Sequence, residues 1–163
     1  MSVILQSNLI MAGLAPLTPS GAKDLVCEVA EYNLAAALAA NNVMEMMVLP
    51  PHMEVAAVAL AVTDLDTGGS PAIVLRAGFM LGTPGDKTFA NRTSSNAIGS
   101  ELITASTVGQ AGGIQVGNVV AMYNAHWSEV ARSIGVQVAT APATGATTGK
   151  VVLQVMMRPF YRR

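Results

Sequence analysis

Short stretches in which apolar and polar residues alternate constrain this chain more than any other feature. A period of two residues is typical of β-strands that bury one face. In residues 150–158 the odd positions are apolar, whereas Gln154 and Arg158 lie at even positions. Residues 134–140 alternate in the same way. Residues 141–149 between them are small, polar and glycine-containing, which predicts that the two strands form a hairpin.

A second pair of strands is predicted in the middle of the chain, at residues 55–63 and 72–80. Residues 64–71 between them are rich in turn-forming residues. The first strand has bulky apolar residues at one parity and alanine at the other, which predicts a core face and a closely covered face. The bulky residues are Val58, Leu60 and Val62, and the alanines are Ala57, Ala59 and Ala61.

Further strands are predicted at residues 25–32, 43–49 and 114–123. Residues 33–42 are rich in alanine and favour a helix by propensity, although they lie between two strand-like stretches. Residues 101–103 fit the start of either a short helix or a strand. About seven or eight short strands separated by turns are typical of an all-β fold, an antiparallel β-sandwich or jelly roll.

The first 24 residues are predicted to form an extended N-terminal arm in front of a jelly-roll-like domain at residues 25–163. Pro16 and Pro19 oppose a regular element in this arm. The arm is nevertheless apolar, and we expect it to pack either on a neighbouring subunit or on its own domain. Its candidate interface residues are Ile4, Leu5, Leu9, Ile10 and Met11.

The chain has too few charges to cover its surface. It is 52% hydrophobic and 12% charged, whereas globular domains carry about 25% charged residues. We therefore expect other protein to cover part of its exterior, including further copies in a dimer or trimer. A net charge of −1 argues against nucleic acid as a partner. No apolar run reaches the ~18 residues of a membrane span, and the N-terminus lacks the pattern of a secretory signal, which predicts synthesis in a cytoplasm.

Catalytic and metal-binding patterns are weak. His52 and His126 lie far apart without other ligands at metal-binding spacing. Asp64 and Asp66 could hold Ca²⁺ in a loop, but aspartates more often stabilise turns by accepting hydrogen bonds from nearby backbone. There is no nucleophile elbow and no phosphate-binding loop with its lysine. We therefore predict a protein that is not an enzyme and has no catalytic residue, metal or cofactor.

The stretch from Val48 through the Pro50-Pro51 turn to the apolar run 56–63, followed by Asp64-Leu65-Asp66, resembles tailed-bacteriophage virion proteins. The resemblance is to small capsid cement or decoration proteins in particular, and it spans residues 25–158. It departs at Pro51-His52, where a glycine-containing turn is more usual. The resemblance implies a jelly-roll domain that oligomerises, binds the major capsid protein on the outside of the virion and stabilises the shell.

Three other functions remain open at this point. A small β-fold hydrolase is one of them, although the sequence shows no acid–base constellation for it. A carbohydrate-binding β-sandwich needs aromatic platforms, and aromatic residues make up only 4% of this chain. A tail or head–tail structural component fits the same resemblance. For the cement function, the candidate contact regions are the N-terminal arm and the alanine face of residues 55–63. Deletion of residues 2–20 is then expected to weaken shell binding or oligomerisation while the β domain still folds.

Overall fold

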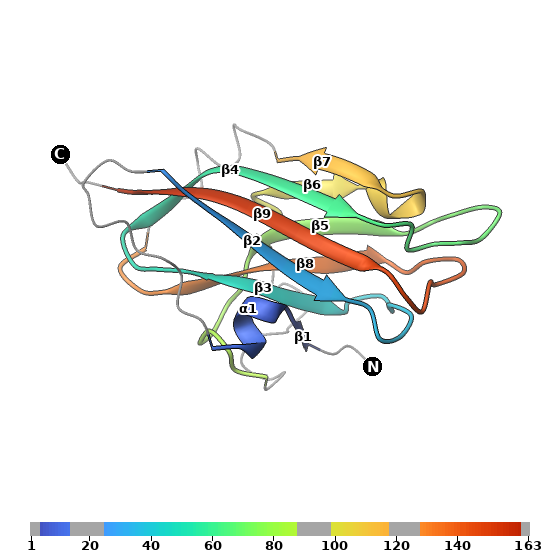
Figure 1. Cartoon of the computed structure of the whole chain (residues 1–163), viewed down its shortest axis with the longest axis horizontal. Helices are drawn as coiled ribbons and strands as arrows, with labels where there is room; N and C mark the ends of the chain where they lie inside the picture. The colour runs from blue at the N-terminus through green and yellow to red at the C-terminus, as the bar shows by residue number, and fades with distance from the viewer. Residues whose placement is uncertain (1–3, 14–24, 88–98, 118–127, 161–163) are drawn as a thin grey trace.

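Two stacked β-sheets form the body of the described chain (Figure 1). The computed structural model describes residues 4–13, 25–87, 99–117 and 128–160. Within these ranges, sheet A has five strands in the order β1-β3-β8-β5-β6, and sheet B has four in the order β2-β9-β4-β7. The strands are β1 (Ile4–Gln6), β2 (Val26–Asn33), β3 (Val43–Leu49), β4 (Met53–Val62), β5 (Val74–Phe79), β6 (Ile103–Ser106), β7 (Gly113–Val116), β8 (Arg132–Thr140) and β9 (Lys150–Pro159). The helical turns are α1 (Asn8–Met11) and the 3-10 turn η1 (Val108–Gln110).

The chain passes from one sheet to the other at most of its connections. From β2 to β5 each strand lies in the sheet opposite to the one before, and β7, β8 and β9 alternate again. This is the strand order of a double-sheet jelly roll. β1 is added in parallel to β3 at the edge of sheet A. The predicted all-β sandwich of jelly-roll type is therefore confirmed.

The predicted hairpin of residues 134–140 and 150–158 is wrong. β8 pairs with β3 and β5 in sheet A, whereas β9 pairs with β2 and β4 in sheet B. β4 and β5 are likewise in opposite sheets. The connections at residues 63–73 and 141–149 are too long to require a tight hairpin, so they can cross the end of the sandwich. Alternation in a sequence determines which face of a strand is buried, but it does not determine the neighbouring strand.

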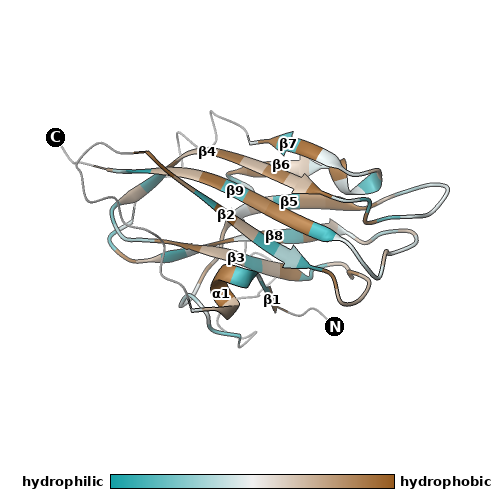
Figure 2. Ribbon diagram, in the orientation of Figure 1, coloured by the Kyte–Doolittle hydropathy of each residue, from teal (hydrophilic) through white to brown (hydrophobic). Residues whose placement is uncertain are grey.

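The core lies between the sheets and is built from the predicted parities. Val58, Leu60 and Val62 of β4 are buried, as are the odd residues of β9 from Val151 to Met157. Figure 2 shows apolar residues along much of both sheets. Burying each of these large side chains stabilises the fold by about 1.5–3 kcal/mol, so the alternation that predicts the strands also holds the sheets together.

The structure also shows the conformation of three further segments that the sequence analysis considered, at residues 33–42, 101–103 and part of 114–123. Residues 34–42 form an irregular connection and no helix, with Leu34 and Leu38 buried at its contacts with the core. β6 begins at Ile103, so residues 101–103 lead into a strand. The strand predicted at residues 114–123 is shorter, since β7 ends at Val116, and residues 118–123 lie outside the described ranges. No helix in those ranges is long and apolar enough to cross a membrane.

Candidate assembly surface

No segment of the described ranges covers the face of sheet B that points away from the core. This face is mostly apolar and is called here the outer face of sheet B. Its members follow from the strand register, because residues opposite each other on neighbouring strands point to the same side. Only one of these side chains is charged. They are Cys27, Val29 and Glu31 of β2, Val152, Gln154 and Met156 of β9, Ala57, Ala59 and Ala61 of β4, and Ile114 and Val116 of β7.

The three predicted interface alanines form the middle of this face. They are partly exposed, while the flanking β7 residues Ile114 and Val116 are 71% and 62% exposed. Because alanine is short, the sheet is hollowed along β4 beside its larger neighbours. The hollow has a volume of about 200 Å³ and is lined by Ala57, Val58, Ala59, Val116, Gln154 and Met156. It can accept an apolar side chain of a partner, and the only polar side chain in its lining is Gln154.

Charged side chains lie at the two ends of this face and are paired. At one end the Lys150 ammonium is 2.9 Å from the Glu31 carboxylate. Hydrogen bonds from Lys150 and Asn33 lower the pKa of Glu31 below its ordinary value. At the other end Arg158 pairs with Glu54. The middle of the face therefore presents apolar surface between two neutralised ends.

The outer face of sheet A is different because the chain itself covers it. Residues 80–87 lie against this face, where the Gly85 N–H donates to the Glu45 carboxylate at 2.9 Å. Glu45 is fully buried, and Met80 packs with Val43 in a small separate apolar cluster. Buried charged groups need such partners. The open apolar face of sheet B thus stands opposite a closed face on sheet A.

Residues 99–102 run along the edge of β5 next to β6, and Gly99 lies against the outer side of Gly78. The Gly99 N–H donates to the Phe79 carbonyl at 3.0 Å, and the Leu102 N–H donates to the Ala77 carbonyl at 3.2 Å. A Cβ atom at Gly78 would overlap the carbonyl of Gly99. Glycine at this position is what allows the covering segment to approach the sheet so closely.

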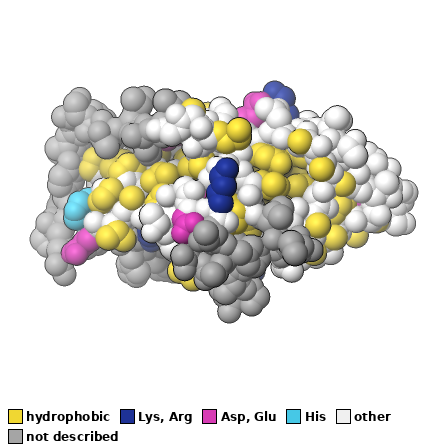
Figure 3. Space-filling model, turned by 90° about the horizontal axis from the view of Figure 1, so that it is seen from below, with side chains coloured by type: hydrophobic (Ala, Val, Ile, Leu, Met, Phe, Trp, Pro, Cys, Tyr) yellow, Lys and Arg dark blue, Asp and Glu magenta, His cyan; other side chains and the backbone are white. Residues whose placement is uncertain are grey.

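The five interface residues predicted in the N-terminal arm lie beside β3, on their own domain. Leu5 and Leu9 pack against the main core, Ile4 and Ile10 are half-buried, and Met11 is 75% exposed. The arm also contains regular elements, β1 and α1, which its proline content argued against. β2 and β9 lie between this arm and the alanines of β4, so the structure does not bring the two predicted groups together. Figure 3 shows hydrophobic side chains over much of one side of the described molecule, with few charges.

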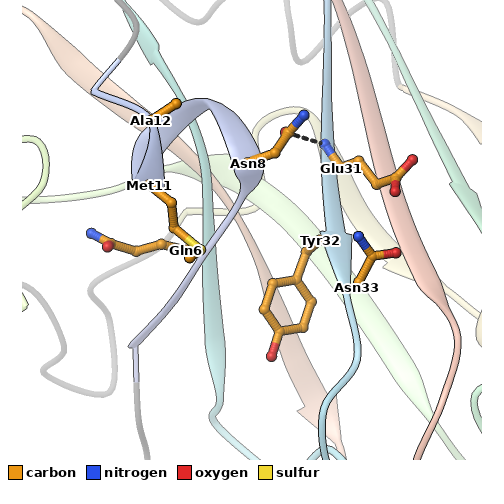
Figure 4. A pocket seen from close by; sticks show the side chains of 7 residues that line it. All are labelled: Gln6, Asn8, Met11, Ala12, Glu31, Tyr32 and Asn33. Atoms are coloured by element: carbon orange, nitrogen blue, oxygen red, sulfur yellow. Dashed lines mark hydrogen bonds between the residues drawn. The ribbon is translucent and has the colours of Figure 1, made fainter.

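A larger hollow lies between the arm and β2 (Figure 4). Its volume is about 530 Å³, and the Asn8 side chain on its rim accepts a 2.9 Å hydrogen bond from the Glu31 N–H. Its one acidic side chain, Glu31, is paired with Lys150. Its other ionisable side chain is Tyr32, whose pKa is raised by burial. Its lining is Gln6, Asn8, Met11, Ala12, Glu31, Tyr32 and Asn33.

Asp64 and Asp66 stabilise the sheet-crossing connections. The Asp64 carboxylate accepts from the Asp66 N–H at 3.0 Å. The buried Asp66 carboxylate accepts from the backbone N–H groups of Ala72, Ile73, Ala143 and Thr144. Burial alone would raise the pKa of Asp66, but these four hydrogen bonds outweigh it and lower the pKa far below its ordinary value. These contacts support the interpretation that Asp64 and Asp66 stabilise turns by accepting hydrogen bonds from backbone N–H groups. No group of three or more His, Cys, Asp or Glu side chains within the described ranges is placed to hold a metal ion.

The two histidines do not form a site together in the described structure. His52 is exposed in the turn between β3 and β4, where its backbone N–H donates to the Ser128 carbonyl at 2.8 Å. Its φ of 58° is in the left-handed region that favours glycine. His126 lies outside the described residues. The departure that the sequence shows at Pro51-His52 therefore coincides with an unusual backbone conformation.

Sequence reasoning missed most of the outer face of sheet B. It identified the alanines of β4 but not the residues beside them on β2, β7 and β9. The alternation in β9 did place Gln154 away from the core, and the same parity includes Val152 and Met156. What the sequence lacked was the pairing of β9 with β4 and β2, which assembles these residues into one surface.

Solved structures similar to this chain come from bacteriophage capsids. A chain from the structure described as "Capsid of Ralstonia phage GP4" is 34% identical, with a TM-score of 0.86, over 98% of this chain and 99% of that one. A chain from "Cyanophage Pam1 capsid asymmetric unit" is 21% identical, with a TM-score of 0.61, over 89% of this chain and 94% of that one, and shows the shared fold. The sequence matches no protein-family model and no curated protein.

The first of these similarities is high enough to assign a family. Identity of 34% extends over nearly the full length of both chains, and the alignment therefore includes both sheets and the N-terminal segment. The all-β sandwich predicted from alternation and the capsid origin implied by the resemblance agree with it. This chain belongs to the family of bacteriophage capsid proteins represented in the capsid of Ralstonia phage GP4.

Proposed function

We propose that this chain is a cement protein that binds the outside of a bacteriophage capsid and holds neighbouring major capsid subunits together. The observation that supports this proposal is the open apolar outer face of sheet B, opposite a sheet A face that the chain covers itself. The largest contiguous apolar patch on a monomer is typically about 300–600 Å² and is often a functional site. With strands ~4.8 Å apart and ~3.3 Å per residue, the four-stranded face offers roughly 300 Å².

The size of this face suits a lattice partner better than a free partner in solution. A stable interface usually buries about 800 Å² on each partner, so this face alone gives a weak contact. When several weak contacts act on one shell, the later ones become intramolecular and the assembly becomes strong. The shell is then stabilised because the protein binds the assembled state. Shell subunits with an apolar surface patch are the partner that this face fits.

The first prediction tests the outer face of sheet B. Ala59→Arg places a charge in the hollow on β4, and burying that charge without a partner is costly. We expect it to weaken binding to shells that lack the protein by about tenfold or more, which corresponds to about 1.4 kcal/mol. Bound protein is measured by co-sedimentation, and shell stability by the temperature at which the shells open.

Ala105→Arg is the matched control for this variant. Ala105 is an exposed alanine in β6 of sheet A, so the same substitution there adds the same charge away from the outer face of sheet B. We expect it to bind like the unmodified protein. If Ala59→Arg and Ala105→Arg decorate shells equally well, the outer face of sheet B is not the contact. Hundreds of copies in each virion would further favour cement over a tail or head–tail component, which needs about a dozen.

The second prediction concerns the N-terminal arm, which we propose as a further contact through exposed Met11 and half-buried Ile10. Deletion of residues 2–20 is expected to weaken shell binding or oligomerisation. The β domain should still fold, because β1 is added at the edge of sheet A outside β3. Circular dichroism reports folding, and co-sedimentation reports binding. Normal decoration by the truncated protein would contradict a binding role for the arm.

A further inference from the structure

β2 is an edge strand whose free side can be identified from its hydrogen bonds. Within the described ranges it pairs only with β9. The Leu34 N–H donates to the Gly149 carbonyl at 2.9 Å, and these two residues continue the β2–β9 register. In an antiparallel ladder every second residue bonds to the partner strand. The even residues of β2 therefore bond to β9, and the backbone N–H and C=O groups of Cys27, Val29 and Glu31 point the other way.

Part of this free edge is already used by the arm. The Asn8 side chain accepts from the Glu31 N–H at 2.9 Å, as Figure 4 shows. No described residue bonds to the outward N–H groups of Cys27 and Val29. Leu25 and Val29 are also 56% and 51% exposed. Among the described residues, the edge of β2 is thus occupied at Glu31 and has no partner strand from Leu25 to Val29, where several side chains are apolar.

We propose that β2 of a second copy pairs antiparallel with this open edge, with Cys27 opposite Cys27 of the second copy. This register places Leu25 opposite Val29 of the second copy, and the same pair forms again across the two-fold axis. It uses the open positions and leaves the Asn8–Glu31 hydrogen bond intact. A register centred on Val29 would place Cys27 opposite Glu31, whose N–H is already occupied. The open edge is therefore complementary to itself in one register.

The dimer deepens the proposed cement function and rests on it. The two-fold axis of an antiparallel strand pair is perpendicular to the sheet, so the same face of both copies points to the same side. The two outer faces of sheet B then form one surface of roughly 600 Å², twice the single-face estimate from strand spacing. One dimer can contact two neighbouring shell subunits at once, which is what cementing requires.

The native cysteine provides a direct test of this register. Cys27 is exposed, and residues opposite each other in a hydrogen-bonded antiparallel pair have Cα atoms about 5.5 Å apart, inside the ~4.4–6.8 Å range for disulfides. Mild oxidation of the full chain, at high concentration and bound to shells, is expected to give a covalent dimer through Cys27. In a Cys27→Ser/Val29→Cys variant the two thiols would lie four residues out of register, roughly 13 Å apart, and no dimer should form. Dimer formation through position 29 but not 27 overturns the proposed register.

Proline substitutions test the backbone hydrogen bonds without relying on the thiol reaction. The Val29 N–H points away from β9, so Val29→Pro leaves the ladder intact, and proline is tolerated at such edge positions. The Ala30 N–H bonds to β9, so Ala30→Pro should lower Tm strongly. Val29→Pro should keep Tm close to that of the unmodified protein and lower Cys27 cross-linking about fivefold or more, since one donor is lost from each copy. A folded Val29→Pro variant that cross-links normally overturns the proposal.

The two proposals fail in different ways. Shell binding and stabilisation without any Cys27 dimer, free or on shells, would overturn β2 pairing and leave the cement function standing. A Cys27 dimer in solution that never binds shells would support β2 pairing and overturn the cement function. Light scattering distinguishes a symmetric dimer from a trimer, in which antiparallel pairing of β2 cannot satisfy all three copies.

Discussion

Asp66 is the single residue that most clearly joins the two connections at one end of the jelly roll. Its carboxylate is buried and accepts hydrogen bonds from residues 72–73 and 143–144, which belong to the two connections that cross between the sheets. An isolated bridge between Asp66 and Gly145 joins the same connections. The sequence suggested a turn-forming aspartate at this position, but not that its partners include a segment 77 residues away.

The third prediction concerns the charge of Asp66. Asp66→Asn is expected to lower Tm at neutral pH, because an amide cannot accept from four N–H groups as a carboxylate does. The pKa of Asp66 is lower in the folded than in the unfolded chain. Its contribution to stability is therefore complete above the unfolded pKa of about 3.9 and is lost as the pH falls through the folded pKa.

Thermal unfolding between pH 7 and pH 2 provides the measurement for Asp66. The Tm difference between the unmodified protein and Asp66→Asn should be constant near neutrality and shrink in strongly acidic solution. Asp64→Asn is the control, because the Asp64 carboxylate accepts one described backbone hydrogen bond and is exposed. Equal effects of the two substitutions at neutral pH would contradict the role given to Asp66.

At the scale of single elements, the sequence predicts strands and faces well and strand partners poorly. The range 43–49 predicted for one strand coincides with β3, and the core parity of β4 and β9 is as predicted. Both properties depend on local alternation, which each strand carries within itself. Pairing depends on whether a connection such as residues 63–73 or 141–149 turns back within one sheet or crosses to the other sheet. Many loop sequences permit both paths.

The N-terminal elements β1 and α1 show that a few local hydrogen bonds can stabilise regular structure in a segment whose composition does not favour it. Ser7 is buried between β1 and α1; its hydroxyl donates to the Met46 carbonyl at the bulge in β3 and accepts from the Ile10 N–H. An N-cap serine directly after the three residues of β1 is hard to infer from the composition of this segment. The bulge supplies a carbonyl that Ser7 can reach, and it cannot be inferred from alternation.

The fourth prediction tests attachment of the arm. Ser7→Ala removes the cap and leaves the Met46 carbonyl without this donor, so we expect a loss of about 1–3 kcal/mol in unfolding free energy. The arm should also become more sensitive to limited proteolysis than the β domain. Ser70→Ala, at an exposed loop position, is the control. If denaturant unfolding gives the same midpoint for both variants, Ser7 does not anchor the arm.

At the scale of the whole molecule, low charge predicted that the exterior is partly covered, but not which part. The structure shows that the chain covers the outer face of sheet A and leaves that of sheet B open within the described ranges. To decide which face is covered, one needs the position of residues 80–87, which lie against the outer face of sheet A, and of Gly99, which lies against Gly78. The sequence of these residues is typical of loops, and their composition does not predict which strand they pack against.

The fifth prediction follows from the position of the last two strands. β8 is central in sheet A, and β9 separates β2 from β4 in sheet B. A chain halted on the ribosome after residue 131 lacks both, so we expect it to be fully sensitive to protease. A chain halted with residues 1–163 outside the ribosome should resist protease. Stepwise acquisition of resistance as β3, β4 and β5 emerge would contradict this expectation.

The positions of β8 and β9 also determine when the proposed contact surfaces can form. Each sheet contains an interior strand that is synthesised after β1 to β7. If folding follows the fifth prediction, a nascent chain without these strands has neither the outer face of sheet B nor an ordered β2 edge. The proposed contacts with a second copy and with the shell would then form only after β9 has been synthesised.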